Sequence, residues 1–416
     1  MKPKINLILL SFLLIINSIS AQFSEDAQIS VLTCGSGSEL YEAFGHTAIR
    51  VCDTAQHIDI VYNYGIFDFN TDYFYLKFAQ GKLLYLLDRT SFEWFLREYT
   101  YYGREVYEQI LNFSPQEKQT FFQLIEENYK PENRYYQYDF FIDNCATRVR
   151  DIVSNSLVNR KFPQITFTKT EQSFRELFLP YTQHFLWWRL GIDIALGSAA
   201  DKKASMWDCM YLPDDLMNQL DTTLLSPTSV PLIESKRMIL GQSKIQHEPS
   251  LISPDWVFWI LFLVIVLLSF TEWKKKKYFK WIDIILFICV GIVSFLVFDL
   301  WFVSDHSATK GNWNILWANP LFFYLLFRLR KTQYLVLWTL TTCLLFFLLG
   351  FCFLPQHFNT AFIPINLMLI VRVLMLIYQR KKFVKLNDWH IFFTISSKSF
   401  QISRTFSSKN HKFSKL

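Results

Sequence analysis

The sequence predicts an α+β domain followed by an all-α bundle of five transmembrane helices. Three observations support this prediction: mixed globular composition over residues 22–250, long apolar segments over 252–380, and a cysteine that opens an amphipathic helix. The chain has 416 residues, 51% of them hydrophobic, which is enough for one soluble domain and a membrane part. The net charge of +6 gathers in clusters beside apolar segments, which indicates membrane topology and not nucleic-acid binding.

Residues 1–21 have the pattern of a secretory signal peptide. Two lysines precede an apolar core from Ile5 to Ile16, and small residues ending at Ala21 form a cleavage site. The apolar core is short for a membrane span, so we favour a signal peptide over the alternative of an uncleaved anchor. Either reading places the following domain, residues 22–220, outside the cytoplasm.

The domain over residues 22–220 contains signals for both strands and helices. Ser114 to Glu117 has the serine, proline and glutamate spacing of a capped helix start. The apolar segment Phe185 to Ile194 either closes the core of this domain or lies at the membrane interface, where tryptophan is enriched, and we favour the core. Alternation and capping together predict strands at 29–34, 46–51, 58–63 and 135–141, and helices at 91–100, 114–129 and from Cys145 onward.

A cysteine stands at the junction between an aromatic strand-like run and a helix. Asp143 and Asn144 are good N-cap residues, and the apolar residues after Cys145 fall on one helical face. The thiol therefore lies in the positive field of a helix N-terminus, which favours the thiolate. Cys145 is the predicted nucleophile.

A histidine at the start of another strand supplies the matching base. A cysteine nucleophile needs a base within hydrogen-bond reach, and that base needs an orienting polar group. Neighbouring antiparallel strands can place His46 and Asn63 on one face. We therefore predict Cys145, His46 and Asn63 as the catalytic residues, with Asp53 as the rival orienting residue.

The seven cysteines show no metal-ligand spacing, so neither a metal nor a cofactor is expected. A disulfide between Cys34 and Cys52 is compatible with an oxidising compartment, and the sequence leaves it open.

A connector rich in proline and glycine, residues 221–252, leads into the membrane part, residues 253–380. Basic clusters follow the first, third and fifth apolar segments, so the amino end is expected outside and the basic tail, 381–416, in the cytoplasm. The five expected spans are 253–271, 281–302, 313–327, 334–354 and 361–379.

Three polar residues of the membrane part have two open interpretations. Asp305 and His306 lie in the loop after the second span, and Arg372 lies within the fifth. Charges in membranes are costly and often functional. The alternative is that the first two are solvated and that Arg372 snorkels or pairs with a neighbouring helix.

The site residues resemble a known group of enzymes. Phe44-Gly45-His46, followed later by Asn144-Cys145 at a helix start, is similar to the permuted papain-like proteins of the NlpC and lecithin:retinol acyltransferase group. In that group histidine precedes cysteine, and many members are lipid acyltransferases. The resemblance implies an NlpC-like papain fold for the soluble domain.

A second resemblance extends over almost the whole chain. It is carried by Leu32 to Cys34, Phe44 to Arg50, Tyr62 to Gly65, Tyr138 to Arg148 and Leu212 to Asp214, together with the membrane part. These segments resemble the Lnb family of Bacteroidota, which has an N-terminal periplasmic domain and is associated with lipoprotein N-acylation.

The Lnb resemblance implies an enzyme of the inner (cytoplasmic) membrane with its catalytic domain in the periplasm. It implies transfer of a fatty acyl chain from a phospholipid donor, through a Cys145 thioester, to the N-terminal amine of a lipoprotein acceptor. Two other classes stay open: a cysteine hydrolase that acts on cell-wall peptide or lipid with water as acceptor, and a non-enzymatic envelope assembly protein with an inert Cys145.

Overall fold

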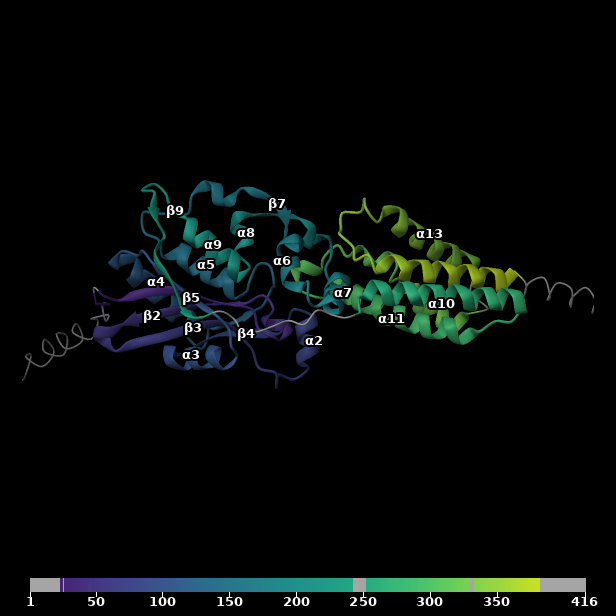
Figure 1. Ribbon diagram of the computed structural model, residues 1–416, viewed down its shortest axis with the longest axis horizontal. Helices are drawn as coiled ribbons and strands as arrows, with labels where there is room; N and C mark the ends of the chain where they lie inside the picture. Colours follow the sequence, from purple (N-terminus) through teal and green to yellow (C-terminus); the bar gives the residue numbers. More distant parts are fainter. Residues whose placement is uncertain (1–22, 25, 242–251, 330–332, 382–416) are drawn as a thin grey trace, which may run out of the picture. The chain divides into compact units, whose positions relative to one another are not determined.

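The computed structural model describes residues 23–24, 26–241, 252–329 and 333–381 (Figure 1). The predicted signal peptide and the basic tail from 382 onward lie outside the described residues. The chain divides into two compact units, of which the first comprises Met1–Arg189, Leu196–Ser250 and Leu300–Gly311. We call this the sheet unit. The helical unit comprises Leu190–Ala195, Leu251–Asp299 and Asn312–Leu416.

The sheet unit is built on a seven-stranded sheet with the order β11-β5-β1-β2-β3-β4-β6. Every pair of neighbouring strands is antiparallel. The strands are β1 (Gln28–Cys34), β2 (His46–Asp53), β3 (Ile58–Ile66), β4 (Leu84–Ser91), β5 (Val106–Leu111), β6 (Tyr135–Gln137) and β11 (Ile233–Leu240).

Both faces of this sheet are covered, so side chains on both sides of a central strand such as β1 are buried. Val51 and Tyr62 belong to the larger core, with residues of α4 (Pro115–Tyr129), α5 (Cys145–Ser156) and α9 (Pro213–Thr222). Their neighbours Ala48 and Val61 belong to a smaller core with Phe95 of α3 (Phe92–Tyr101). Figure 1 shows α3 on the side of the sheet opposite α4 and α5. The sheet unit is therefore a mixed α/β domain.

The predicted connector, residues 221–252, contributes a strand to this sheet. β11 pairs with β5 at the sheet edge, and Arg237 donates to the buried Glu108 at 2.7 Å. Half of the residues of β11 are polar, as suits an edge strand, and the nearby proline and glycine residues dominate the local pattern.

Short elements complete the sheet unit. They are η1 (Leu40–Glu42), η2 (Thr54–Gln56), α2 (Phe74–Ala79), η3 (Gln164–Phe167), β7 (Lys169–Ser173), α6 (Phe174–Thr182), η4 (Ser198–Asp201), β8 (Lys203–Ser205), α8 (Met206–Cys209), β9 (Leu224–Leu225), β10 (Val230–Pro231) and η5 (Ser307–Thr309).

The apolar segment Phe185 to Ile194 does not close the core of the soluble domain as predicted. It forms α7 (Leu186–Ala195), whose last residues, Leu190–Ala195, belong to the helical unit. There, Asn314 donates to the Asp193 carbonyl at 2.8 Å and Asn359 donates to the Asp193 carboxylate at 2.9 Å. Sequence alone does not reveal these partners, which lie far along the chain.

Within the described residues, three helices are long and apolar enough to cross a membrane: α10 (Pro254–Lys275), α11 (Lys280–Phe302) and Phe362–Lys381. The fourth expected span is a shorter apolar helix, α13 (Tyr334–Gly350). The third is divided into η6 (Trp313–Leu316) and α12 (Leu321–Arg328), with Pro320 between them, where a proline disfavours a continuous helix. The count of five spans stays a prediction.

Arg372 pairs with neighbouring helices of the helical unit, which is one of the two alternatives to a functional role that the sequence offered. Its guanidinium contacts the carboxylates of Glu272 and Asp283, each at 2.6 Å, and the hydroxyl of Ser269 at 2.8 Å. All three charged side chains are fully buried. The network therefore joins α10, α11 and the helix Phe362–Lys381.

Candidate active site

The predicted nucleophile opens helix α5. Its N-cap is Asn144, whose Oδ1 accepts hydrogen bonds from the backbone N–H groups of Ala146 and Thr147, both at 2.9 Å. The Thr147 hydroxyl accepts from the Asn144 backbone N–H at 2.8 Å, which completes a reciprocal cap. Cys145 is therefore fixed at the first helical position, as the sequence predicted.

Asn144 also ties the nucleophile to more distant segments. Its side-chain nitrogen donates to the carbonyl of Phe140 at 2.8 Å and to that of Tyr211 at 2.9 Å. The Asn144 side chain is only 4% exposed, so it donates to both carbonyls at a place that water does not reach. This second role follows from tertiary contacts and gave no signal in the sequence.

His46 and Asn63 lie together, as predicted for the base and its orienting residue. His46 Nε2 is 3.3 Å from Asn63 Oδ1. An amide oxygen only accepts hydrogen bonds, so Nε2 carries the proton and Nδ1 has the free lone pair. The Asn63 contact therefore prepares Nδ1 to accept a proton.

The cysteine approaches the strands that carry these two residues. The backbone N–H of Thr47, next to His46, interacts with the Cys145 thiol. A Cβ at Gly65 of β3 would lie 3.7 Å from Cys145 Cβ, and Gly65 has φ +96°, a conformation that favours glycine. The structure thus brings Cys145 to the end of β2 and β3, where His46 and Asn63 reside.

Burial controls the protonation of the site. It raises the pKa of Cys145, although the backbone N–H groups of Thr47 and Ala146 act in the opposite direction. Burial also lowers the pKa of His46 to about 4, with a further contribution from Arg104. The backbone N–H groups at the helix start do favour the thiolate, as predicted, but desolvation is the larger effect and the pKa of Cys145 is raised overall. At neutral pH the pair is a thiol and a neutral imidazole.

Arg104 is a charged neighbour of the site that the sequence analysis missed. It is 6% exposed, donates to the Gly35 carbonyl at 2.8 Å and contacts Glu42 at 3.1 Å. Its charge lowers the pKa of His46 and, as one of several smaller effects, that of Cys145. A single arginine in the turn after α3 has no distinctive pattern in the sequence.

Strand register excludes two alternatives that the sequence left open. Asp53 lies at the other end of β2 from His46, where it accepts from the Ser24 hydroxyl at 2.8 Å, so it does not orient His46. Cys34 pairs with His46 across β1 and β2, whereas Cys52 pairs with Gln28. The two cysteines are thus separated by nearly the whole strand, well beyond the reach of a disulfide.

A loop that follows α11 supports the nucleophile turn. The Asp139 carboxylate accepts from the backbone N–H of Ser307 at 2.7 Å and from its hydroxyl at 2.9 Å. The same carboxylate accepts from the backbone N–H of Phe141 at 3.0 Å and from that of Ile142 at 3.3 Å. Loop and nucleophile turn are therefore joined at one buried carboxylate within the sheet unit.

The neighbouring loop residues Asp305 and His306 also make structural contacts. The Asp305 backbone N–H donates to the Gln80 carbonyl at 2.8 Å, and His306 Nε2 lies 2.7 Å from the Phe78 carbonyl. Both carbonyls belong to the end of α2 or to the residue after it. The His306 side chain is therefore not simply solvated, whereas the Asp305 side chain is exposed, in agreement with the second interpretation.

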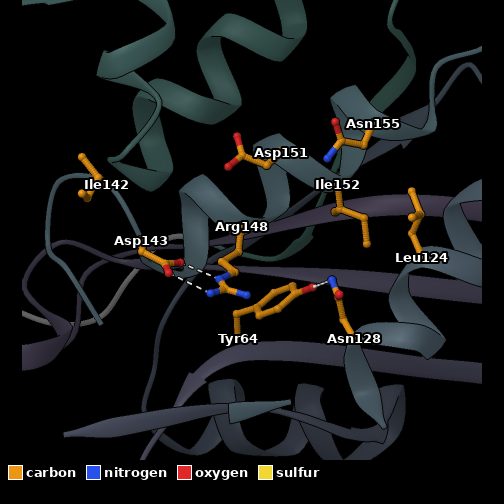
Figure 2. A pocket seen from close by; sticks show the side chains of 9 residues that line it. All are labelled: Tyr64, Leu124, Asn128, Ile142, Asp143, Arg148, Asp151, Ile152 and Asn155. Carbon is orange, nitrogen blue, oxygen red and sulfur yellow. Dashed lines mark hydrogen bonds and ion pairs between the residues drawn. The ribbon is translucent and has the colours of Figure 1, made fainter. Parts of the chain in front are cut away.

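A cavity of about 350 Å³ lies beside the site but does not contain it. Figure 2 shows its lining, in which Arg148 forms an ion pair with Asp143 and Asn128 donates to the Tyr64 hydroxyl at 2.8 Å. Cys145, His46 and Asn63 are not among the residues that line it. Since its charged groups are engaged in ion pairs, this cavity adds no reactive group to the site.

No group of three histidine, cysteine or carboxylate side chains within the described residues is arranged to bind a metal ion. The groups that the structure offers for chemistry are thus a thiol, a neutral imidazole and backbone N–H donors. Such a set is suited to nucleophilic acyl transfer.

Two family models match the chain. Residues 20–179 match the Lnb N-terminal periplasmic domain, and residues 246–383 match the Lnb transmembrane domain. The first match includes His46, Asn63 and Cys145, and the second includes all three long apolar helices. No curated protein and no solved structure matches the chain.

Proposed function

This chain belongs to the Lnb family, and from this premise we propose that it is a thiol acyltransferase that completes bacterial lipoproteins. Family membership indicates a membrane protein with a periplasmic domain in lipoprotein processing. The finer proposal is that it moves a fatty acyl chain from a phospholipid to a lipoprotein's N-terminal amine. The observation that supports it is that Cys145 lies against the backbone of Thr47 and near Gly65, while His46, the residue before Thr47, has its Nε2 3.3 Å from Asn63 Oδ1.

In the first step Cys145 attacks the ester carbonyl of a phospholipid. His46 Nδ1 accepts the thiol proton as the carbon–sulfur bond forms, so that the high pKa of the buried thiol is no obstacle. The ester carbon–oxygen bond then breaks, and the imidazolium returns the proton to the departing oxygen. The products of this step are a Cys145 thioester and a lysophospholipid.

The negative oxygen of the tetrahedral intermediate needs hydrogen-bond donors. The backbone N–H groups of Cys145 and Thr47 are our candidates, because both interact with the thiol. The Ala146 N–H already donates to Asn144 Oδ1. Donors fixed in a partly dry site stabilise developing charge without reorganisation.

In the second step the α-amine of the lipoprotein attacks the thioester. An α-amino group has a pKa near 8, so a useful fraction is neutral at neutral pH. His46 accepts a proton from the attacking nitrogen and returns it to the sulfur as the thioester bond breaks. The products are an N-acylated lipoprotein and the free Cys145 thiol.

We further propose that the sheet unit is a permuted papain-like domain and that the protein resides in the inner membrane. The order of the histidine strand before the cysteine helix supports the first proposal. The three long apolar helices support a membrane location, and that location gives the site access to both lipid substrates.

The proposal is tested by expressing the full chain with a diacylated lipoprotein in a host that lacks N-acylation. Mass spectrometry of the lipoprotein N-terminus is expected to show one added acyl chain. The Cys145→Ser variant is expected to abolish the product, whereas the matched control Cys52→Ser, at the other end of β2, is expected to retain it.

Two results would contradict the transferase. Release of free fatty acid or peptide cleavage without an acylated amine would identify a hydrolase with the same nucleophile. Full lipoprotein acylation by Cys145→Ser would remove the cysteine from the reaction. A thioester trapped on Cys145 excludes the inert assembly protein in either case.

A further inference from the structure

The sheet unit carries an exposed aromatic surface that no step of the proposed chemistry uses. We call it the α2 surface and define it as the segment from Phe67 to Ala79. Tyr73 and Tyr75 are 78% and 80% exposed, and Leu76 and Phe78 are also exposed. Large apolar side chains gathered in this way mark an interaction site.

The backbone of the α2 surface is shaped to hold these side chains outward. Tyr73, the N-cap residue of α2, has φ +58° and makes no side-chain capping bond. That conformation is unfavourable for a bulky residue and persists where the surrounding structure fixes it. The rings of Phe67, Phe69 and Phe74 contact one another with centroid distances from 4.9 to 5.8 Å. Phe69 is itself exposed, so this aromatic cluster adds to the exposed surface.

Hydrogen bonds connect the end of α2 to the chain directly after α11. Ser304 donates to the Ala79 carbonyl at 3.0 Å, Asp305 donates to the Gln80 carbonyl, and His306 lies 2.7 Å from the Phe78 carbonyl. Gly81, with φ +69°, allows the close approach, since a Cβ there would lie 3.0 Å from the His306 nitrogen. These contacts all lie within the sheet unit.

The position of α2 along the chain bears on its depth in a bilayer. α11 has 23 residues, a length of about 34 Å that matches the hydrocarbon core of a bilayer. Its last residue is Phe302, so an α11 that spans the membrane would bring Ser304 to His306 to the headgroup layer. We propose that the α2 surface inserts into the outer leaflet of the bilayer that contains α11.

The composition of the α2 surface fits this occupant. Tyrosine is enriched where protein meets headgroups, because its ring is apolar and its hydroxyl polar. Two acidic residues, Asp68 and Asp72, balance Lys77 and the nearby Lys82. Insertion therefore depends on apolar contact, and we expect it in neutral phosphatidylcholine bilayers and at high salt.

The insertion has a consequence for the candidate site. Gly65 faces Cys145, and the next residues along the chain, Ile66 and Phe67, lead into the α2 surface. An inserted α2 surface holds the nucleophile close to the glycerol esters of the outer leaflet. This consequence rests on the proposed function, whereas the insertion itself does not.

The test uses the full chain in phosphatidylcholine nanodiscs that contain a phospholipid with a diazirine close to its glycerol ester. The Cys145→Ala variant is used, so that the probe is not consumed. After illumination, mass spectrometry is expected to find adducts on residues 73–79 at several-fold higher yield than on α3. That helix is a fair comparison, since its Tyr101 is 84% exposed and Figure 1 shows it apart from α2.

Two variants complete the test. Leu76→Glu is expected to lower the adduct yield on 73–79 several-fold, whereas Tyr101→Glu on α3 leaves it unchanged. If Leu76→Glu does not fold, the measurement is repeated with Tyr75→Ser, because the Tyr75 side chain is 80% exposed. Equal adduct yields on α2 and α3 in the parent protein would overturn the insertion. Adducts on α2 without lipoprotein acylation by the wild type would leave the insertion standing and reject the proposed function.

Discussion

At the scale of single residues, the candidate site is a neutral pair and not a preformed ion pair. Burial raises the pKa of Cys145 and lowers that of His46 to about 4. A neutral pair keeps the thiol protonated until a substrate carbonyl arrives, which protects it from oxidation, since the thiolate is the reactive form.

The low pKa of His46 predicts the pH dependence of thioester formation. Attack needs the neutral imidazole, so lysophospholipid release in a single turnover is expected to fall only as the pH drops through about 4. In Asn63→Asp, a carboxylate beside Nε2 favours the imidazolium and raises the pKa of His46. The acid limb is then expected to move toward neutral pH, and Asn63→Ala is the control that removes the contact without adding charge.

Arg104 is expected to tune the same pair by its charge. Arg104→Gln removes a positive charge that lowers the pKa of both His46 and Cys145, so both pKa values are expected to rise. The rate of Cys145 alkylation by iodoacetamide, followed against pH, is expected to shift to higher pH. Arg104→Lys keeps the charge and serves as the control. An unchanged alkylation profile in Arg104→Gln would contradict an electrostatic role.

At the scale of elements, helix α5 and its preceding turn depend on partners from elsewhere in the chain. Asp139 accepts four hydrogen bonds, two of them from Ser307. Asp139→Ala leaves those buried donors without an acceptor, and we expect a loss of about 2–3 kcal/mol in the free energy of unfolding. The loss is measured by thermal unfolding. Asp151→Ala, which removes a contact at a more exposed carboxylate, is the control.

The helices and strands also show which parts of the candidate site could be predicted from the sequence. The Cys145 helix and its Asn144 cap were predictable, because capping and helical periodicity are local. His46 and Asn63 were predictable as a pair, because alternation along two neighbouring antiparallel strands places them on the same face of the sheet. Arg104 and the Asn144 contact with Tyr211 were not, because they depend on which distant segments meet.

At the scale of the whole molecule, the buried charges of the helical unit form its main polar network. Arg372→Gln leaves Glu272 and Asp283 buried without their partner, and we expect a loss of stability of about 3–5 kcal/mol. The measurement is the midpoint of thermal unfolding in detergent. Lys275→Gln, at the exposed end of α10, is expected to leave the midpoint unchanged. Recovery of the midpoint by replacing all three charges with apolar residues would confirm that the unpaired charges cause the loss.

The two-unit division was predictable, whereas the exchange of segments between the units was not. Long apolar runs identify the helical unit from composition alone. Yet Leu300–Gly311, which follows α11, belongs to the sheet unit, and Leu190–Ala195 belongs to the helical unit. Both exchanged segments are held by polar contacts, such as those of Asp139 and Asn314, and these polar residues carry no periodic signal in the sequence.

The contact between Ser307 and Asp139 also sets an order of events during biosynthesis. Ribosomes make Asp139 and Cys145 well before Ser307, and in the proposed topology Ser307 reaches the periplasmic side only after α10 and α11 have entered the membrane. Until then the turn before Cys145 lacks two of its hydrogen bonds. In that topology the turn gains its full set of hydrogen bonds only in an anchored chain, and we expect an unanchored precursor to react more slowly.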